Sequence, residues 1–173
     1  MQSQPSVPRP EIYDETVFKL LMEYEVARSI RYETPLSLLR IGLALLNPIE
    51  TEINNAPAAL ASMLNMRLRG ADVPARIGDE FAVLLPSTNE SAARSVCERL
   101  LRITLGTQNT PLGFATRVTI CIGLASRGGH SAFTAGQIME EAMTALRHAR
   151  SMGPQTYRSY TDTMIRRTNN HGG

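Results

Sequence analysis

Apolar residues recur along the chain with two alternating periods, one typical of helices and one typical of buried strands. Helical spacing near the start predicts an amphipathic first helix, with apolar positions Val17, Leu20, Leu21, Tyr24 and Ala27. The following segment, residues 36–46, is a nearly continuous apolar run after a proline, which is typical of a buried central strand. Helical spacing then returns in a short stretch, at Leu60, Met63, Leu64 and Leu68.

A clear turn signal lies at Gly78-Asp79, between two segments with strand character. Glycine at the first central position of a two-residue loop fits a type II′ turn, which needs a positive φ at that position. We therefore predict a β-hairpin with strands over residues 73–77 and 80–85.

Two capping boxes mark the starts of later helices, Ser87-x-x-Glu90 and Thr134-x-x-Gln137. Each predicted helix has an apolar inner face: Ala93, Val96, Cys97 and Leu100 in the first, and Ile138, Ala142, Ala145, Leu146 and Ala149 in the second. Residues 117–125 have the pattern of another core strand, and a short strand is expected near Tyr157.

The element order α-β-α-β-β-α-β-α predicts an α/β sandwich in which helices flank a central mixed sheet of about five strands. Neither an internal repeat nor a low-complexity linker interrupts the pattern, so residues 12–159 are expected to form one domain. Residues 1–11 and 160–173 are polar and are predicted to be a flexible leader and a flexible tail.

The composition and charge of the chain argue against a few classes of function. A net charge of +2 is too small to indicate a nucleic-acid polymer as partner. No apolar run approaches the roughly 18 residues that span a bilayer, and the polar start lacks the apolar core of a signal peptide. Membrane insertion is therefore not expected, and the predicted location is the cytoplasm. Cys97 and Cys121 lie in apolar segments and are predicted to be buried free thiols.

Five short motifs in chain order resemble the GGDEF domain, the bacterial family whose active members make cyclic di-GMP from two GTP molecules. They are TPLSLL at 34–39, ARIGDEFAVLLP at 75–86, CERL at 97–100, VTICIGLA at 118–125 and ALRHARSMG at 145–153. The resemblance implies the GGDEF fold, a relative of the nucleotide-cyclase palm, over about residues 15–158. The signature is one glycine short, because Gly78 alone stands between Ile77 and Asp79.

The resemblance also indicates which parts of the cyclase chemistry are missing. Joining two GTP molecules requires metal ions held by carboxylates, and the family takes one carboxylate from the pattern D-x-D-x-F-K on its first strand. This chain has Gly42 and Ala44 at those aspartate positions. Asp79 and Glu80 remain, and they are expected to be remnants without catalytic duty. No metal site and no cofactor is expected, and Mg²⁺ would matter only if GTP binding persists.

The family's substrate-binding motifs have also been replaced. The stretch N-D…G-H-x-x-G-D, which holds guanine in the family, gives way to PIETEINNAP at 48–57. The leader D-x-L-T-G-L-x-N-R is absent from residues 10–20, and Arg150 stands in for a late lysine. Cyclase activity is therefore not expected.

One ligand motif of the family is retained, an R-x-x-D sequence at Arg69 to Asp72. In the family this motif binds cyclic di-GMP at an inhibitory site, usually with a second arginine from the following helix, here Arg99. Arginine forks suit phosphates and the guanine edge. The resemblance thus implies a cyclic di-GMP site at Arg69, Asp72 and Arg99, with Arg28 as a further clamp from a neighbouring molecule. The same spacing also fits a simple local ion pair.

The sequence thus predicts a catalytically inactive GGDEF-like domain that acts as a cyclic di-GMP receptor and signals to a protein partner or to a second copy. Two alternatives remain open. One is a ligand-independent protein-interaction module, and the other is a weak diguanylate cyclase or GTP-binding regulator.

Overall fold

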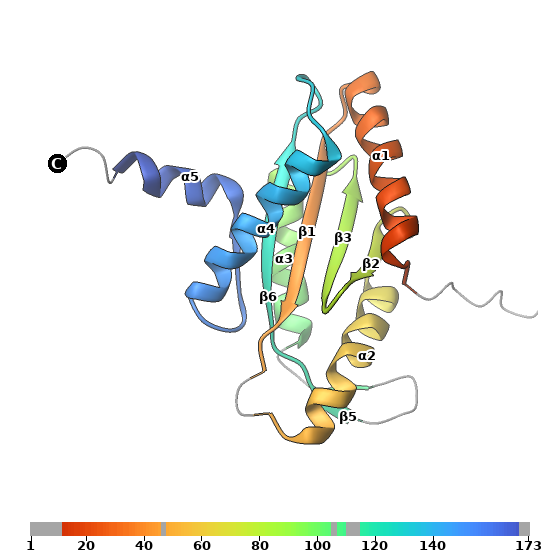
Figure 1. The fold of residues 1–173 in the computed structure, drawn as a ribbon, viewed down its shortest axis with the longest axis vertical. Helices are drawn as coiled ribbons and strands as arrows, with labels where there is room; N and C mark the ends of the chain where they lie inside the picture. Colours follow the sequence, from red (N-terminus) through yellow and green to blue (C-terminus); the bar gives the residue numbers. More distant parts are fainter. Residues whose placement is uncertain (1–11, 46–47, 105–106, 110–114, 170–173) are drawn as a thin grey trace, which may run out of the picture.

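A computed structural model describes residues 12–45, 48–104, 107–109 and 115–169 (Figure 1). The predicted leader, 1–11, lies outside this part. The central element is a five-stranded sheet of order β2-β3-β1-β6-β7. The predicted mixed sheet is confirmed, because β7 pairs with β6 in parallel while the other neighbours are antiparallel. Its strands are β1 (Leu36–Leu43), β2 (Val73–Ile77), β3 (Glu80–Pro86), β6 (Ile120–Arg127) and β7 (Thr156–Ser159).

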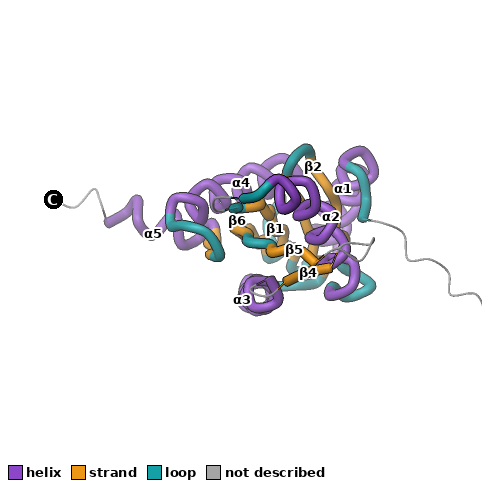
Figure 2. Tube along the Cα trace, turned by 90° about the horizontal axis from the view of Figure 1, so that it is seen from below, coloured by secondary structure: helices purple, strands orange, loops and turns teal. Residues whose placement is uncertain are grey.

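Two pairs of helices cover the two faces of the sheet, as Figure 2 shows in a view along its layers. Helices α1 (Glu15–Tyr32) and α4 (Ala135–Ser151) pack on one face, and α2 (Glu50–Arg67) and α3 (Glu90–Thr104) pack on the other. In β1, Leu36 and Leu38 join the first layer while Leu39 and Ile41 join the second, as the alternation of a strand requires. A small sheet of β4 (Thr107–Asn109) and β5 (Ala115–Arg117) was not predicted.

Of the hairpin turn and the two capping boxes that the sequence predicted, the structure confirms the turn and one box. Gly78 has φ +59°, as the predicted hairpin turn requires. The capping box at Thr134 is confirmed, because its N–H donates to Gln137 Oε1 at 2.9 Å and its hydroxyl accepts from Gln137 N–H at 3.1 Å. The predicted box at Ser87 is wrong. Asn89 caps α3 instead, and its Oδ1 accepts from the N–H of Ala92 at 2.9 Å.

The first helix forms as predicted, but the apolar positions that predicted it are not the ones that pack on the sheet. The residues that α1 buries are Phe18, Met22, Val26 and Ser29. Leu20 and Tyr24, which belong to the predicted stripe, are 68% and 65% exposed. Helix α1 therefore carries apolar residues on two sides, and only one side packs on the sheet.

The structure has a helix, α5 (Tyr160–Asn169), where the sequence predicted the start of a flexible tail. That prediction is wrong for these residues, because Ser159 and Asp162 provide a helix start. The N–H of Ser159 donates to Asp162 Oδ2 at 3.1 Å, which is one half of a capping box. The Ser-x-x-Asp spacing is the sequence signal for this helix. Residues 170–173 lie outside the described part.

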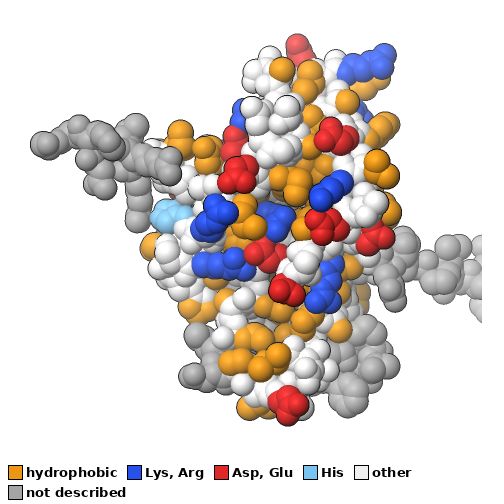
Figure 3. Space-filling view, viewed as in Figure 1, with side chains coloured by type: hydrophobic (Ala, Val, Ile, Leu, Met, Phe, Trp, Pro, Cys, Tyr) orange, Lys and Arg blue, Asp and Glu red, His pale blue; other side chains and the backbone are white. Residues whose placement is uncertain are grey.

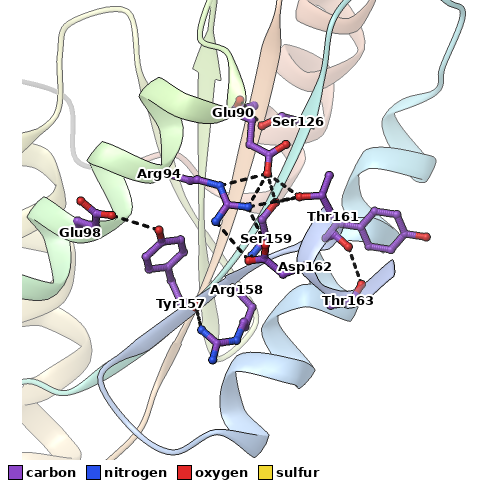
Figure 4. Close-up of polar contacts among 12 residues, drawn as sticks. Glu90, Arg94, Glu98, Ser126, Tyr157, Arg158, Ser159, Thr161, Asp162 and Thr163 are labelled. Carbon is purple, nitrogen blue, oxygen red and sulfur yellow. Dashed lines mark hydrogen bonds and ion pairs between the residues drawn. The ribbon is translucent and has the colours of Figure 1, made fainter. Parts of the chain in front are cut away.

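Helix α5 is held against α3 by an ionic network (Figure 4). Arg94 of α3 donates to Asp162 and to Glu90, each at 2.8 Å. Glu90 also accepts from Ser159 Oγ at 2.7 Å and from Thr161 Oγ1 at 2.6 Å. Partial burial raises the pKa of both carboxyl groups. The hydrogen bonds from Thr161, Ser159 and Arg94 at Glu90, and from Arg94 at Asp162, outweigh burial and hold each pKa below its usual value.

We expect acid to release α5 before it unfolds the sheet. Because both carboxyl pKa values are lower in the folded state, their contribution is full above the unfolded values, near pH ~4, and is lost as the pH falls through the folded values. Backbone amide NMR spectra recorded from neutral to acidic pH would show the α5 signals shifting first. In Arg94→Gln those signals should already be shifted at neutral pH. Signals from α5 and the sheet that shift together would contradict this order.

Within the described ranges, no helix is both long and apolar enough to cross a membrane. Cys97 and Cys121 are buried and unpaired, as predicted. Burial raises the pKa of the Cys97 thiol strongly, so this sulfur stays protonated and unreactive at neutral pH.

Candidate functional site

The hairpin acid Glu80 lies between two arginines from distant parts of the chain. Arg40, on the neighbouring strand β1, donates from Nη2 to Glu80 Oε2 at 2.7 Å. Arg150, in the last turn of α4, donates from Nη1 to Glu80 Oε1 at 3.1 Å. Each carboxylate oxygen thus has its own guanidinium partner. Glu80 is largely buried and Arg40 is buried, whereas Arg150 is 41% exposed, so the ion-pair cluster extends from the interior to the surface.

Gly42 makes room for Arg150. Ile41 pairs with Phe81 in the β1–β3 register, so the next residue, Gly42, comes beside Glu80 on the same face of the sheet. A Cβ placed on Gly42 would lie 2.3 Å from Arg150 Nη2. The guanidinium of Arg150 therefore lies directly over the glycine, in the space that any side chain at position 42 would enter.

The residues at this edge do not fit a divalent metal ion. Magnesium requires several oxygen ligands in near-octahedral geometry. Gly42 and Ala44 offer no side-chain oxygen, and both oxygens of Glu80 are engaged by cations. Asp79 is exposed at the tip of the turn. No group of three or more His, Cys, Asp or Glu side chains able to hold a metal occurs in the described ranges.

A pocket of about 530 Å³ opens between the start of α1, helix α2 and strand β2. Its α2 wall consists of Ala58, Ala61, Ser62 and Asn65, which includes no carboxylate. Asp14, on the opposite wall, uses Oδ1 to accept from the N–H of Val17 at 2.9 Å and so caps α1. The carboxylate that lines this pocket therefore has a structural part in capping α1.

The structure brings Arg69 and Asp72 together in the loop between α2 and β2. Asp72 has a fully buried side chain, whereas that of Arg69 is 59% exposed. Asp72 Oδ1 accepts from Arg69 Nη2 at 3.2 Å, and Oδ2 accepts from the backbone N–H of Arg69 at 3.0 Å. Thr88 Oγ1 also accepts from Arg69 Nη2, at 2.9 Å. The local ion pair is therefore present, and it holds an exposed guanidinium in a fixed position.

The carboxylate of Asp72 faces inward and is bonded to Arg69. As a buried carboxylate already occupied by Arg69, it positions the arginine rather than facing solvent. Thr88 was missed by the sequence analysis. It is buried, and its hydroxyl donates to the carbonyl of Pro86 at 2.9 Å, which orients its oxygen toward Arg69. A threonine shortly after a strand forms no recognisable sequence motif, so the contact between Thr88 and Arg69 can be seen only in the structure.

The two other predicted arginines make no hydrogen bond or ion pair with this pair within the described residues. Arg99 is on the third turn of α3, half-buried, with a buried Nε that has no hydrogen-bond partner in the described structure. Arg69 contacts Thr88 just before α3, and Arg99 comes nine residues after Glu90, about 14 Å further along the axis of the helix. Arg28, on α1, donates to Glu25 at 3.2 Å.

Comparison with protein families gives one match. The family model described as "Diguanylate cyclase, GGDEF domain" matches residues 57–156. No curated protein matches the chain significantly.

Solved structures with the same fold include several GGDEF domains. The GGDEF domain of YfiN (TpbB) from Pseudomonas aeruginosa has a TM-score of 0.74 at 21% identity, covering 90% of this chain and 95% of that one. The active GGEEF domain of a diguanylate cyclase from Vibrio cholerae has a TM-score of 0.73 at 18% identity, with 86% and 97% covered. The GGDEF domain of DgcB from Caulobacter crescentus, in complex with c-di-GMP, has a TM-score of 0.69 at 15% identity, with 92% and 99% covered. At these identities the likeness establishes the fold.

Proposed function

Because the chain belongs to the GGDEF family of diguanylate cyclase domains, we propose that it binds cyclic di-GMP as a receptor and does not synthesise it. The observation that carries this proposal is the contrast between two sites. At the hairpin, arginines bind both carboxylate oxygens of Glu80. In the R-x-x-D pair, Asp72 fixes the position of Arg69 while the side chain of Arg69 stays exposed to solvent.

The hairpin supports the loss of synthesis. Phosphoryl transfer between two GTP molecules needs cations that neutralise spread negative charge in the transition state. Arg40 and Arg150 already neutralise Glu80, and Gly42 provides no ligand. A metal ion would have to displace two guanidinium groups, one of them buried, before it reached a single carboxylate. Glu80 is therefore a structural anion in this proposal, and Asp79 has no catalytic partner.

The R-x-x-D loop supports binding of an anionic nucleotide. The guanidinium of Arg69 is fixed by Asp72 and Thr88 through Nε and Nη2, and its Nη1 makes no bond within the described residues. A fixed arginine loses less side-chain entropy when it binds a phosphate or a guanine edge. Cyclic di-GMP carries two phosphates and two guanines, so one molecule or a stacked pair offers acceptors to Arg69 and to Arg99.

Calorimetric titration with cyclic di-GMP tests this proposal. Wild-type protein should release heat with a saturable isotherm, and Arg69→Ala should bind about 10- to 100-fold more weakly, since a hydrogen bond to a charged group contributes about 1.5–3 kcal/mol. The matched control is Arg147→Ala. Arg147 is 64% exposed and also faces an acidic side chain, but it lies on α4, on the other face of the sheet. Its removal should leave the isotherm unchanged.

A nucleotide assay completes the test. Incubation of the protein with GTP and Mg²⁺ or Mn²⁺, followed by chromatography, should give no cyclic di-GMP above a denatured control. Product formation would refute the loss of synthesis, and a flat wild-type isotherm would refute the receptor. A flat isotherm together with an inactive assay would favour the ligand-independent interaction module instead.

A further inference from the structure

The outward face of α1 carries an apolar seam that packs on nothing in the described structure. Its members are Val17, Leu20, Tyr24 and Ala27, all exposed. Figure 3 shows hydrophobic side chains at the surface along the edge formed by α1. Their spacing is three, four and three residues, which is the a and d pattern of a heptad repeat.

This seam lies opposite the face that α1 packs on the sheet. Successive residues of a helix are turned by about 100°, so Leu20 and the buried Met22 point about 160° apart. The buried face follows a different spacing, from Phe18 through Met22 to Val26. The helix therefore has two separate apolar faces. A helix that is apolar on both sides is typical of one buried on both sides.

We propose that the outward seam of α1 binds the same seam of a second copy of this chain, with the two helices parallel. The charges beside the seam argue for this occupant. With Leu20 at position d, Glu23 is at position g and Arg28 is at the following position e. In a parallel pair, position g of one helix faces position e of the next heptad in the other helix. Glu23 therefore meets Arg28 of the second copy, and twofold symmetry forms this ion pair twice.

The same charges disfavour an antiparallel pair. If Leu20 faced Tyr24 of an antiparallel copy, the two helices would cross between these residues, and Glu23 would come close to Glu23 of the other copy. Arg28 keeps donors for the parallel contact, because only its Nη1 is engaged with Glu25 and its side chain remains half-exposed. Opposite charges thus select the orientation, as they do in helical pairs generally.

The contact should be weak and reversible. The seam covers two heptads, fewer than a free-standing coiled coil requires, and one helix face buries less area than a standard interface. We therefore expect a monomer at low micromolar protein and a dimer near millimolar protein, in the absence of nucleotide. This dimer does not depend on the proposed cyclic di-GMP site, which lies in the loop after α2.

Sedimentation equilibrium and a single cysteine test the seam and its orientation. Leu20→Glu should abolish association at the highest concentration, while Met66→Glu, at an equally exposed apolar position on α2, should not change it. Ala27→Cys should form a disulfide-linked dimer under mild oxidation, because parallel helices place position 27 opposite itself, whereas the antiparallel pair that crosses between residues 20 and 24 does not. Wild-type protein should not cross-link, since Cys97 and Cys121 are buried.

Charge exchange tests the ion pair. Glu23→Arg should weaken the association several-fold at low salt, and adding Arg28→Glu in the same chain should restore it. A wild-type monomer at near-millimolar concentration would overturn the proposal. A dimer that persists in Leu20→Glu, or an Ala27→Cys protein that does not cross-link, would overturn it equally.

Discussion

Gly123→Ala is expected to lower the free energy of unfolding by about 3 kcal/mol, the upper part of the range for overpacked cores. Gly123 lies on β6 directly beneath α4. A Cβ at this position would lie 2.2 Å from the carbonyl oxygen of Ala142 and 2.2 Å from the backbone nitrogen of Leu146. These are helix backbone atoms, which cannot rotate away as a side chain can. Helix α4 would have to move off the sheet, and its buried face would lose contacts along its length.

Urea unfolding measures this effect. An unchanged slope of the unfolding free energy against urea concentration would show that the folded and unfolded states expose the same surface as in the wild type. Gly136→Ala is the matched control. Gly136 is exposed near the start of α4, and its nearest neighbour would lie 3.8 Å from an added Cβ. Replacing a helical glycine by alanine there should raise stability by about 0.5–1 kcal/mol. A Gly123→Ala protein as stable as wild type would mean that α4 does not pack as described.

Glu80→Gln is expected to cost about 3 kcal/mol of stability, because it leaves a buried cation without its counter-charge. Arg40 is buried, its Nε has no partner in the described structure, and Glu80 is its ion-pair partner. Glutamine can still accept one hydrogen bond, but it cannot neutralise two arginines. The expected loss distinguishes a structural carboxylate from a catalytic one. Active-site carboxylates usually lower the stability of the folded protein, so their removal tends to raise it.

Asp79→Asn is the control at the adjacent position. Asp79 is exposed at the turn, and exposed substitutions usually change stability by less than about 0.5 kcal/mol. Thermal and urea unfolding of the two variants, compared with wild type, separate the roles of the two acids. An increase in stability in Glu80→Gln would contradict the structural role of Glu80 and would make the hairpin a candidate active site.

The elements and their order could be predicted because their signals are local. Gly78 needs only its own φ to turn the hairpin, and Thr134 with Gln137 closes a cap within four residues. The buried face of α1 could not be predicted in this way. Two apolar stripes of similar strength run along that helix, and hydrophobicity alone does not say which one the sheet covers.

The contacts at the candidate site depend on pairs that are distant in sequence. Arg150 could be matched to a family lysine, but its contact with Glu80, seventy residues earlier, follows from where α4 ends over the sheet. Arg40 reaches Glu80 through the register of β1 on β3. The spacing of Arg69 and Asp72 predicted their proximity correctly, whereas the complete burial of Asp72 required the fold.

The position of Arg150 over Gly42 determines what a carboxylate at that position would bind. An aspartate placed at position 42 would meet the guanidinium within contact distance, and the guanidinium would neutralise its charge in competition with any dissolved cation. The new carboxylate would thus become one more partner in an arginine cluster. Creating a metal-binding edge from this arrangement therefore calls for a change of Arg150 together with Gly42.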